Sequence, residues 1–261
     1  MIINNINIKV KRFSSKEMKL IINDYLKLVK NNEVTIIYKN KESIFELFLI
    51  CNLYKNNNIK VNLILTYLPY QRMDHNNGIE APILQYVASL FNSLNLNSLK
   101  VCEPHCELTY FKKAEKINIV EKIYNKAKNL INFNEETDYL IFTDKGAKSR
   151  YSNLGKNHIY FEKCRDINTG LICKHKMIGE LKKGSKAILI DDIISSGDTI
   201  CSCLNYINCD LYIICGHIEN NKYNERLINN KNIKRIYSTN SLRKRQKGNL
   251  KLFKVEDLIM E

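Results

Sequence analysis

Runs of apolar residues recur along the chain, and the segments between them carry apolar residues at helical spacing. The short apolar runs predict buried strands at residues 34–38, 61–65, 99–102, 139–142, 158–161, 187–190, 211–215 and 233–237. Helical spacing predicts helices at residues 43–54, 83–94, 121–131, 199–207 and 221–228. Because strands and helices alternate, the pattern indicates an α/β fold with mainly parallel sheets flanked by helices.

The length of 261 residues suits two domains or one large α/β unit. The strand and helix pattern favours two halves of similar plan, which we place at residues 1–125 and 126–261. The chain has no apolar run of some 18 residues and no secretory signal, so we expect neither a membrane span nor export. Nine cysteines, an odd number, then indicate reduced thiols in the cytoplasm.

The net charge of +14 suits either a nucleic-acid partner or an enzyme whose substrates carry several phosphates. Lysine and arginine are spread along the chain, and Arg243, Lys244, Arg245 and Lys247 form the one tight cluster. This cluster has no interleaved aromatic residues on which bases could stack. We therefore interpret it as a solvated loop and expect no nucleic-acid partner.

The stretch ILIDDIISSGDT at residues 188–199 carries the strongest functional signal. An apolar strand is followed by Asp191 and Asp192, and then by small residues that open a predicted helix. In α/β sheets ligands bind beyond the carboxyl ends of strands, where the amides of a helix N-terminus favour an anion. We expect the acids to bind two sugar hydroxyls and a phosphate to be held by Ser195, Ser196, Gly197 and Thr199.

Four further segments place polar residues at predicted strand ends or in the loops that follow them. They are YLPYQRMDH, VCEPHCE, IFTDKGAKSR and YFEKCRD, with candidate residues Arg72, Asp74, His105, Asp144, Lys163 and Arg165. One imidazole, one carboxylate and two cations beside a sugar-phosphate loop suit diphosphoryl transfer from a metal-bound nucleotide. Mg²⁺ takes few protein ligands together with phosphate oxygens, so His105 and Asp144 suffice to seat it.

The order of these motifs resembles the ribose-phosphate pyrophosphokinase family over roughly residues 60 to 240. YLPYQRMDH is similar to the family's nucleotide-binding stretch, EPHCE and FTDKGAKSR to its metal segments, EKCR to its catalytic loop, and ILIDDIISSGDT to its ribose-phosphate loop. The resemblance implies two phosphoribosyltransferase-like domains, Mg²⁺ as cofactor, ATP as diphosphate donor and a homo-oligomer.

Residue roles follow from the same resemblance. Arg72, Asp74 and His105 would bind ATP, and His105 with Asp144 would hold the metal-nucleotide. Lys163, Arg165 and His105 would be catalytic. The sugar phosphate would be bound by Asp191, Asp192, Ser195, Ser196, Gly197, Asp198 and Thr199.

The chain departs from the family pattern at several positions. Met73 and His75 replace the usual Gln and Lys of the nucleotide stretch, and RFSSKE at residues 12–17 is at most a remnant of an adenine-binding element. Asp198 places an acid inside the phosphate turn, where it would repel a phosphate unless its side chain points outward.

Four functions stay open. The leading one is synthesis of phosphoribosyl pyrophosphate from ribose 5-phosphate for nucleotide biosynthesis. The same transfer to ADP-ribose, in NAD salvage, fits the Arg72-Met73-Asp74 form of the nucleotide stretch and the K-x-R-D-x-x-T-G form of the loop at residues 163–170. A phosphoribosyl pyrophosphate-binding regulator or inactive partner subunit would not need Lys163 and Arg165. A base-using phosphoribosyltransferase would need only one core domain.

Overall fold

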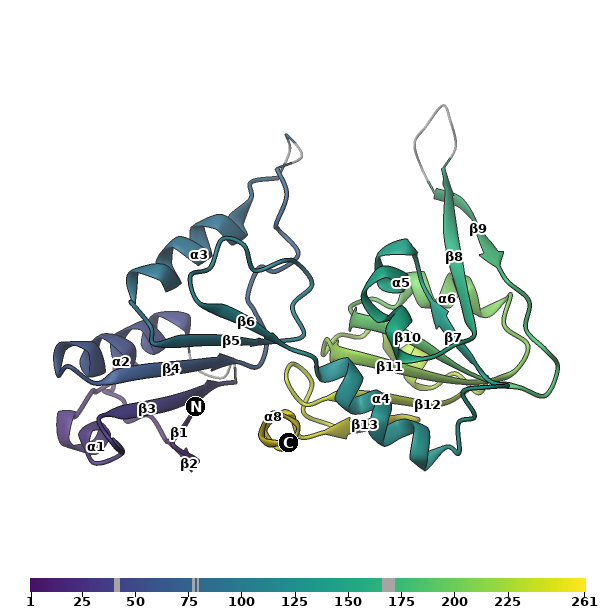
Figure 1. Ribbon diagram of the computed structural model, residues 1–261. Helices are drawn as coiled ribbons and strands as arrows, with labels where there is room; N and C mark the ends of the chain where they lie inside the picture. The colour runs from purple at the N-terminus through teal and green to yellow at the C-terminus, as the bar shows by residue number, and fades with distance from the viewer. Residues whose placement is uncertain (40–42, 77, 79, 166–171) are drawn as a thin grey trace. The chain divides into compact units, whose positions relative to one another are not determined.

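The chain divides into two compact units, Met1–Ile117 and Asn118–Glu261 (Figure 1). The computed structural model describes residues 1–39, 43–76, 78, 80–165 and 172–261, and for 163–165 and 172–175 it describes the backbone alone. The division falls at residue 117 and not at the expected residue 125. The reason is that helix α4 (Ile119–Leu130) packs as a whole on the sheet of the second unit.

The first unit is built on a six-stranded sheet with the order β2-β1-β3-β4-β5-β6. The short strands β1 (Ile2–Ile3) and β2 (Ile6–Asn7) pair antiparallel at one edge. The other neighbours are parallel: β3 (Glu33–Tyr38), β4 (Lys60–Leu65), β5 (Ser98–Cys102) and β6 (Ala114–Ile117). The helices of this unit are α1 (Ile22–Leu26), α2 (Ile44–Asn56) and α3 (Ile83–Ser93).

The second unit is built on a seven-stranded sheet with the order β13-β12-β11-β10-β7-β8-β9. Its strands are β7 (Tyr139–Phe142), β8 (His158–Arg165), β9 (Ile172–Ile178), β10 (Lys186–Ile194), β11 (Asp210–Ile218), β12 (Ile233–Thr239) and β13 (Leu250–Phe253). Only β8 and β9 pair antiparallel among the described strands of this sheet. The remaining helices are α5 (Lys145–Tyr151), a 3₁₀ turn (Ser152–Leu154), α6 (Asp198–Leu204), α7 (Glu225–Ile228) and α8 (Val255–Met260).

The centre of the second sheet positions the candidate site. β10 lies between β7 and β11, and both neighbours run parallel to it. Its residues 187–190 are fully buried, as expected of a parallel strand covered by helices on both faces. Because the three strands are parallel, their carboxyl ends meet at one edge of the sheet. The loops after β7, β10 and β11 therefore lie next to one another.

The predicted α/β fold with mainly parallel sheets is confirmed, and each strand expected from the apolar runs is present. The helix expected at 221–228 is shorter, because α7 begins only at Glu225. The Asn221 side chain accepts hydrogen bonds from the backbone N–H groups of Tyr223 (3.0 Å) and Asn224 (3.1 Å), which replaces the first helical turn by an Asx turn. Among the described residues, no helix has the length and apolar character needed to span a membrane.

Candidate functional site

Two adjacent carboxylates, Asp191 and Asp192, lie near the carboxyl end of β10. The sequence had suggested that the acids follow the strand. The strand instead continues to Ile194, so the acids lie within its last residues. On the side of β7, pairing stops at Ile190 opposite Phe142. The residues that follow β7 therefore come to lie beside the two acids.

Residues after β7 contact both carboxylates. The Thr143 hydroxyl donates to Asp191 Oδ2 (3.2 Å), and Arg150 Nη2 donates to Asp192 Oδ1 (3.1 Å). Arg150 is carried on α5, whose N-cap is Asp144: its Oδ1 accepts a hydrogen bond from the N–H of Ala147 (2.9 Å). The structure thus gathers the predicted residues Asp144, Asp191 and Asp192 at one end of the sheet.

The charges of this cluster act on one another. Burial raises the pKa of Asp191 well above its ordinary value, and the neighbouring Asp192 and Asp144 carboxylates raise it further. Burial opposes the charge on Arg150, but the attraction of the carboxylates, chiefly Asp192, outweighs it and raises the Arg150 pKa. Asp191 therefore keeps its proton to a higher pH than a free carboxyl group, and the Arg150 guanidinium balances the charge of Asp192.

The turn after β10 depends on Gly197. Its φ of +81° lies in the left-handed region, which side chains with a Cβ rarely adopt. A Cβ at this position would lie 2.3 Å from Leu227 Cδ1, well inside van der Waals contact. Glycine is therefore required both by the backbone conformation and by the close packing of the turn against α7.

Asp198, the acid inside this turn, is directed outward and paired. Its carboxylate accepts hydrogen bonds from the Ser196 hydroxyl and from Arg226 Nη2. The Ser196 hydroxyl and the Arg226 guanidinium together lower the pKa of Asp198, which therefore stays ionised. Arg226 supplies the opposite charge, so the repulsion of a phosphate expected from the sequence is largely offset.

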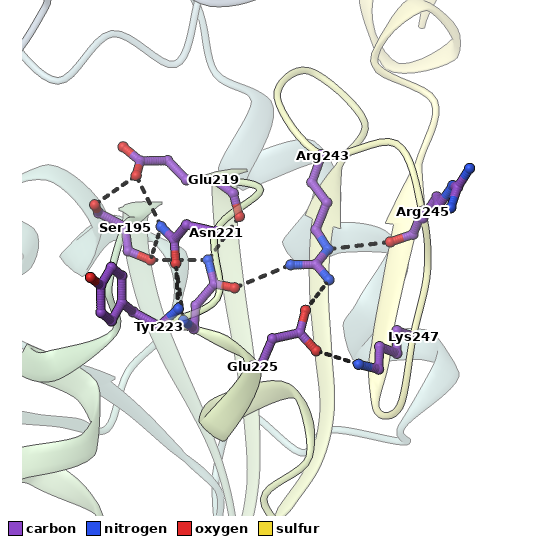
Figure 2. Close-up of polar contacts among 9 residues, drawn as sticks. Ser195, Glu219, Asn221, Tyr223, Glu225, Arg243, Arg245 and Lys247 are labelled. Carbon is purple, nitrogen blue, oxygen red and sulfur yellow. Dashed lines mark hydrogen bonds and ion pairs between the residues drawn. The ribbon is translucent and has the colours of Figure 1, made fainter.

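Ser195 is held from the side of β11 and the loop after it (Figure 2). Its hydroxyl donates to Glu219 Oε2 (2.7 Å). Its carbonyl accepts from the side-chain amides of Asn221 (3.2 Å) and Asn224 (3.0 Å). Ser195 therefore anchors the start of the turn, while Thr199 lies in the first turn of α6.

In the first unit, the loops after β4 and β5 meet through Gln71. This side chain is fully buried, and its Oε1 accepts a hydrogen bond from the backbone N–H of His105 (3.1 Å). Arg72 is exposed, and Asp74 lies half-buried with His75 Nε2 at 3.5 Å from its Oδ2. The predicted nucleotide stretch is thereby joined to the segment that carries His105.

Lys163 and Arg165 lie on β8, opposite His175 and Ile172 of β9, and their side chains are outside the described part of the chain. Asp166, Thr169 and Gly170 lie outside the described residues. His105 belongs to the first unit, and Asp144 belongs to the second. The joint metal-nucleotide site of His105 and Asp144 stays a prediction.

Sequence reasoning missed several residues that support the site. Thr143 and Arg150 lie in the segment FTDKGAKSR, and Gln71 lies in YLPYQRMDH. Their hydrogen-bonding side chains, in the same segments as predicted site residues, were the signal that could have identified them. The basic cluster was only partly a solvated loop, because Arg243 is buried at 4% exposure. No local signal reveals Arg226 or Arg243, since their partners Asp198 and Asn224 are distant in sequence.

No family model matches the chain. A ribose-phosphate pyrophosphokinase of Saccharolobus solfataricus is 31% identical over 185 residues, covering 66% of this chain and 62% of the relative. A ribose-phosphate pyrophosphokinase of Sulfolobus acidocaldarius is 32% identical over 196 residues, covering 70% and 66%. The chain thus spans less than two thirds of the length of these curated relatives.

Among solved structures, the phosphoribosylpyrophosphate synthetase of Mycobacterium smegmatis has a similar fold. The TM-score is 0.74 at 17% sequence identity, and the match covers 96% of this chain and 87% of the other. At that identity the match speaks for the fold. It supports the expected phosphoribosyltransferase-like architecture of the two units.

Proposed function

The chain belongs to the ribose-phosphate pyrophosphokinase family, and on this premise we propose that it transfers the β,γ-diphosphate of Mg²⁺-ATP to the 1-hydroxyl of ribose 5-phosphate. The products are phosphoribosyl pyrophosphate and AMP. The observation that carries this proposal is the placement of the Asp191–Asp192 pair directly before the Gly197 turn at the end of β10.

The acceptor side follows from that placement. Asp191 and Asp192 accept hydrogen bonds from two neighbouring sugar hydroxyls, and Thr143 and Arg150 keep the carboxylates in place. The first N–H groups of a helix have no partner within the helix, so the start of α6 offers donors to the 5-phosphate. Ser196, Gly197 and Thr199 form this part of the turn, and Arg226 balances the charge of Asp198.

In the transfer, the oxygen of the sugar 1-hydroxyl forms a bond to the β-phosphorus of ATP. The bond between that phosphorus and the oxygen shared with the α-phosphate breaks, AMP leaves with the electron pair, and the hydroxyl proton is released. Lys163 and Arg165 would stabilise the charge on the moving diphosphoryl group, which is the main source of catalysis in such reactions.

On the donor side, Arg72, Asp74 and His105 would bind ATP, and His105 with Asp144 would hold Mg²⁺. In the described part of the chain no three acidic, histidine or cysteine side chains form a metal-binding group, so a Mg²⁺ ion bound by His105 and Asp144 would take most of its ligands from phosphate oxygens. Mg²⁺ would neutralise charge on the phosphate oxygens. We further propose that the protein acts in the cytoplasm as a homo-oligomer.

The test is release of AMP from Mg²⁺-ATP with ribose 5-phosphate and, separately, with ADP-ribose. We expect release with ribose 5-phosphate. Release with ADP-ribose alone would assign the second acceptor, in keeping with the variant residue Met73. No release with either acceptor would favour a phosphoribosyl pyrophosphate-binding regulator.

Lys163→Ala separates binding from transfer. We expect turnover to be lost while ribose 5-phosphate binding, measured by calorimetry, stays nearly unchanged. Loss of binding alone, or unchanged turnover, would contradict the role proposed for Lys163.

A further inference from the structure

We propose that Asn224 and Arg243 are positioning residues that hold the turn at residues 195–199, the proposed phosphate site, in a fixed conformation. Both come from segments that follow the turn in sequence. Asn224 lies in the loop after β11, and Arg243, which is labelled in Figure 2, lies in the loop after β12. This inference rests on the proposed function, since it assigns the turn a sugar phosphate as ligand.

Asn224 joins the ends of two strands. The side chain is fully buried, and its Nδ2 donates both to the carbonyl of Ser195 (3.0 Å) and to the carbonyl of Glu219 (2.7 Å). Those carbonyls belong to the residues that directly follow β10 and β11. Because the amide group has two N–H donors, both are used in this link.

Arg243 holds Asn224 in turn. Its Nη1 donates to Asn224 Oδ1 (3.1 Å), its Nη2 to the Glu225 carboxylate, and its Nε to the carbonyl of Arg245 (3.3 Å). The side chain is only 5% exposed. A charge buried to this degree is unfavourable unless it is paired and hydrogen-bonded, and here each guanidinium nitrogen has a partner.

The Glu225 carboxylate supplies the negative charge that balances the buried Arg243 guanidinium. The Arg243 guanidinium, and then the Lys247 ammonium, lower the pKa of Glu225, so this carboxylate stays ionised at neutral pH. Lys247 Nζ lies 2.7 Å from Glu225 Oε2 at the exposed rim of the cluster. In the basic cluster, the buried Arg243 and the exposed Lys247 therefore both pair with the Glu225 carboxylate.

The same network occupies the hydroxyl group of Ser195. Its hydroxyl is bound to Glu219 Oε2, and that oxygen also accepts from Asn221 Nδ2 (3.2 Å). We therefore assign Ser195 to positioning. The contacts to phosphate fall to the segment from Ser196 to Thr199.

The chain of contacts from Arg243 through Asn224 to Ser195 predicts a particular kinetic effect. Loss of the link lets the turn move, and a displacement of about 1 Å at a binding group can reduce the rate about 10²-fold. Asn224 and Arg243 do not contact ATP in this scheme. We therefore expect the KM for the acceptor to rise about tenfold and the KM for ATP to stay unchanged.

The variants are Asn224→Asp, which keeps the shape but removes the two N–H donors, and Arg243→Met, which removes the charge. Arg243→Lys keeps the charge and should recover part of the effect. Arg245→Met is the matched control, because Arg245 is an exposed arginine of the same loop that gives the network only its carbonyl. Steady-state kinetics and calorimetric binding of ribose 5-phosphate are measured for each, below its Tm.

Acceptor binding that weakens about tenfold in Asn224→Asp and Arg243→Met, with no larger loss in the double variant, is the expected result. Equal rises in both KM values, or full acceptor affinity despite a lowered Tm, would overturn the proposal. If Arg243→Met does not fold, the acceptor KM and acceptor affinity of Asn224→Asp and Arg243→Lys test the proposal instead. Failure of the proposed function would instead appear in the wild-type protein, as absence of AMP release.

Discussion

Replacement of Gly197 by alanine tests whether the tight turn after β10 forms the phosphate site. Two effects add in this variant. The φ of +81° places alanine in the left-handed region, which costs about 1–2 kcal/mol. The new Cβ would also lie 2.3 Å from Leu227 Cδ1, where carbon atoms normally keep about 3.5–4.0 Å.

Leu227 is fully buried and cannot move aside without disturbing the core of the second unit. Overpacking of this kind costs about 1–3 kcal/mol. The free energy of unfolding should therefore fall by about 2–5 kcal/mol in total. For a domain of this size, each kcal/mol lowers Tm by about 2–4 °C.

Gly184→Ala is the matched control. Gly184 has a φ of +85°, and a Cβ there would meet nothing within 4 Å. Its cost should be limited to the backbone term of about 1–2 kcal/mol, and its acceptor KM should equal that of the wild type. The assay combines thermal unfolding with acceptor kinetics below the Tm of each variant.

Equal Tm losses in the two variants would show that the contact with Leu227 does not constrain the turn. A wild-type KM for ribose 5-phosphate in Gly197→Ala would show that the turn does not bind the phosphate. The first result would refute the packing argument, and the second would refute the placement of the sugar phosphate at the end of β10.

Three further predictions concern the charges of the same site. Burial raises the pKa of Asp191, so this carboxyl ionises at lower pH in the unfolded chain than in the folded protein, and stability falls as pH rises from about 4 towards the folded pKa. Asp191→Asn should therefore raise Tm at pH 7 but not at pH 3, while acceptor binding weakens. An unchanged Tm at pH 7 would contradict this prediction. Asp198→Asn should lower the acceptor KM and Arg226→Ala should raise it, because the two charges offset each other beside the phosphate, and added salt should shrink both changes. Arg150→Met leaves the buried Asp192 carboxylate without its guanidinium partner and should lower the free energy of unfolding by about 3–5 kcal/mol, as measured by urea denaturation; a loss below 1 kcal/mol would refute the pairing.

The strands β3, β4, β5, β7, β8, β10, β11 and β12 were predictable because each contains a short apolar run that burial requires. The strands β1, β2, β6, β9 and β13 were not predicted, and each of them lies at or next to an edge of its sheet. The end of β10 was harder to predict, since Asp191 and Asp192 look like a terminus although pairing with β11 continues to Ile194. The helix expected at 221–228 was too long for a related reason. Its apolar spacing is real, but Asn221 binds backbone N–H groups in competition with the helix.

The partners of the site residues could not be predicted in this way. Asp198 was expected to repel a phosphate unless its side chain points outward. The side chain does point outward, and its partner Arg226 comes near only because α7 packs beside the turn. Arg243 was interpreted as part of a solvated loop because its basic cluster has no interleaved aromatic residues. Its burial follows from contacts with Asn224 and Glu225, which lie at the start of α7.

Phosphorus NMR of the reaction products tests the proposed transfer most directly. The protein is incubated with Mg²⁺-ATP and ribose 5-phosphate, and the ³¹P signals are followed over time. We predict that AMP and a sugar carrying both a 5-phosphate and a 1-diphosphate form in equal amounts. Formation of ADP with a singly phosphorylated 1-position, or ATP that stays intact in the presence of the acceptor, would contradict the proposed diphosphoryl transfer.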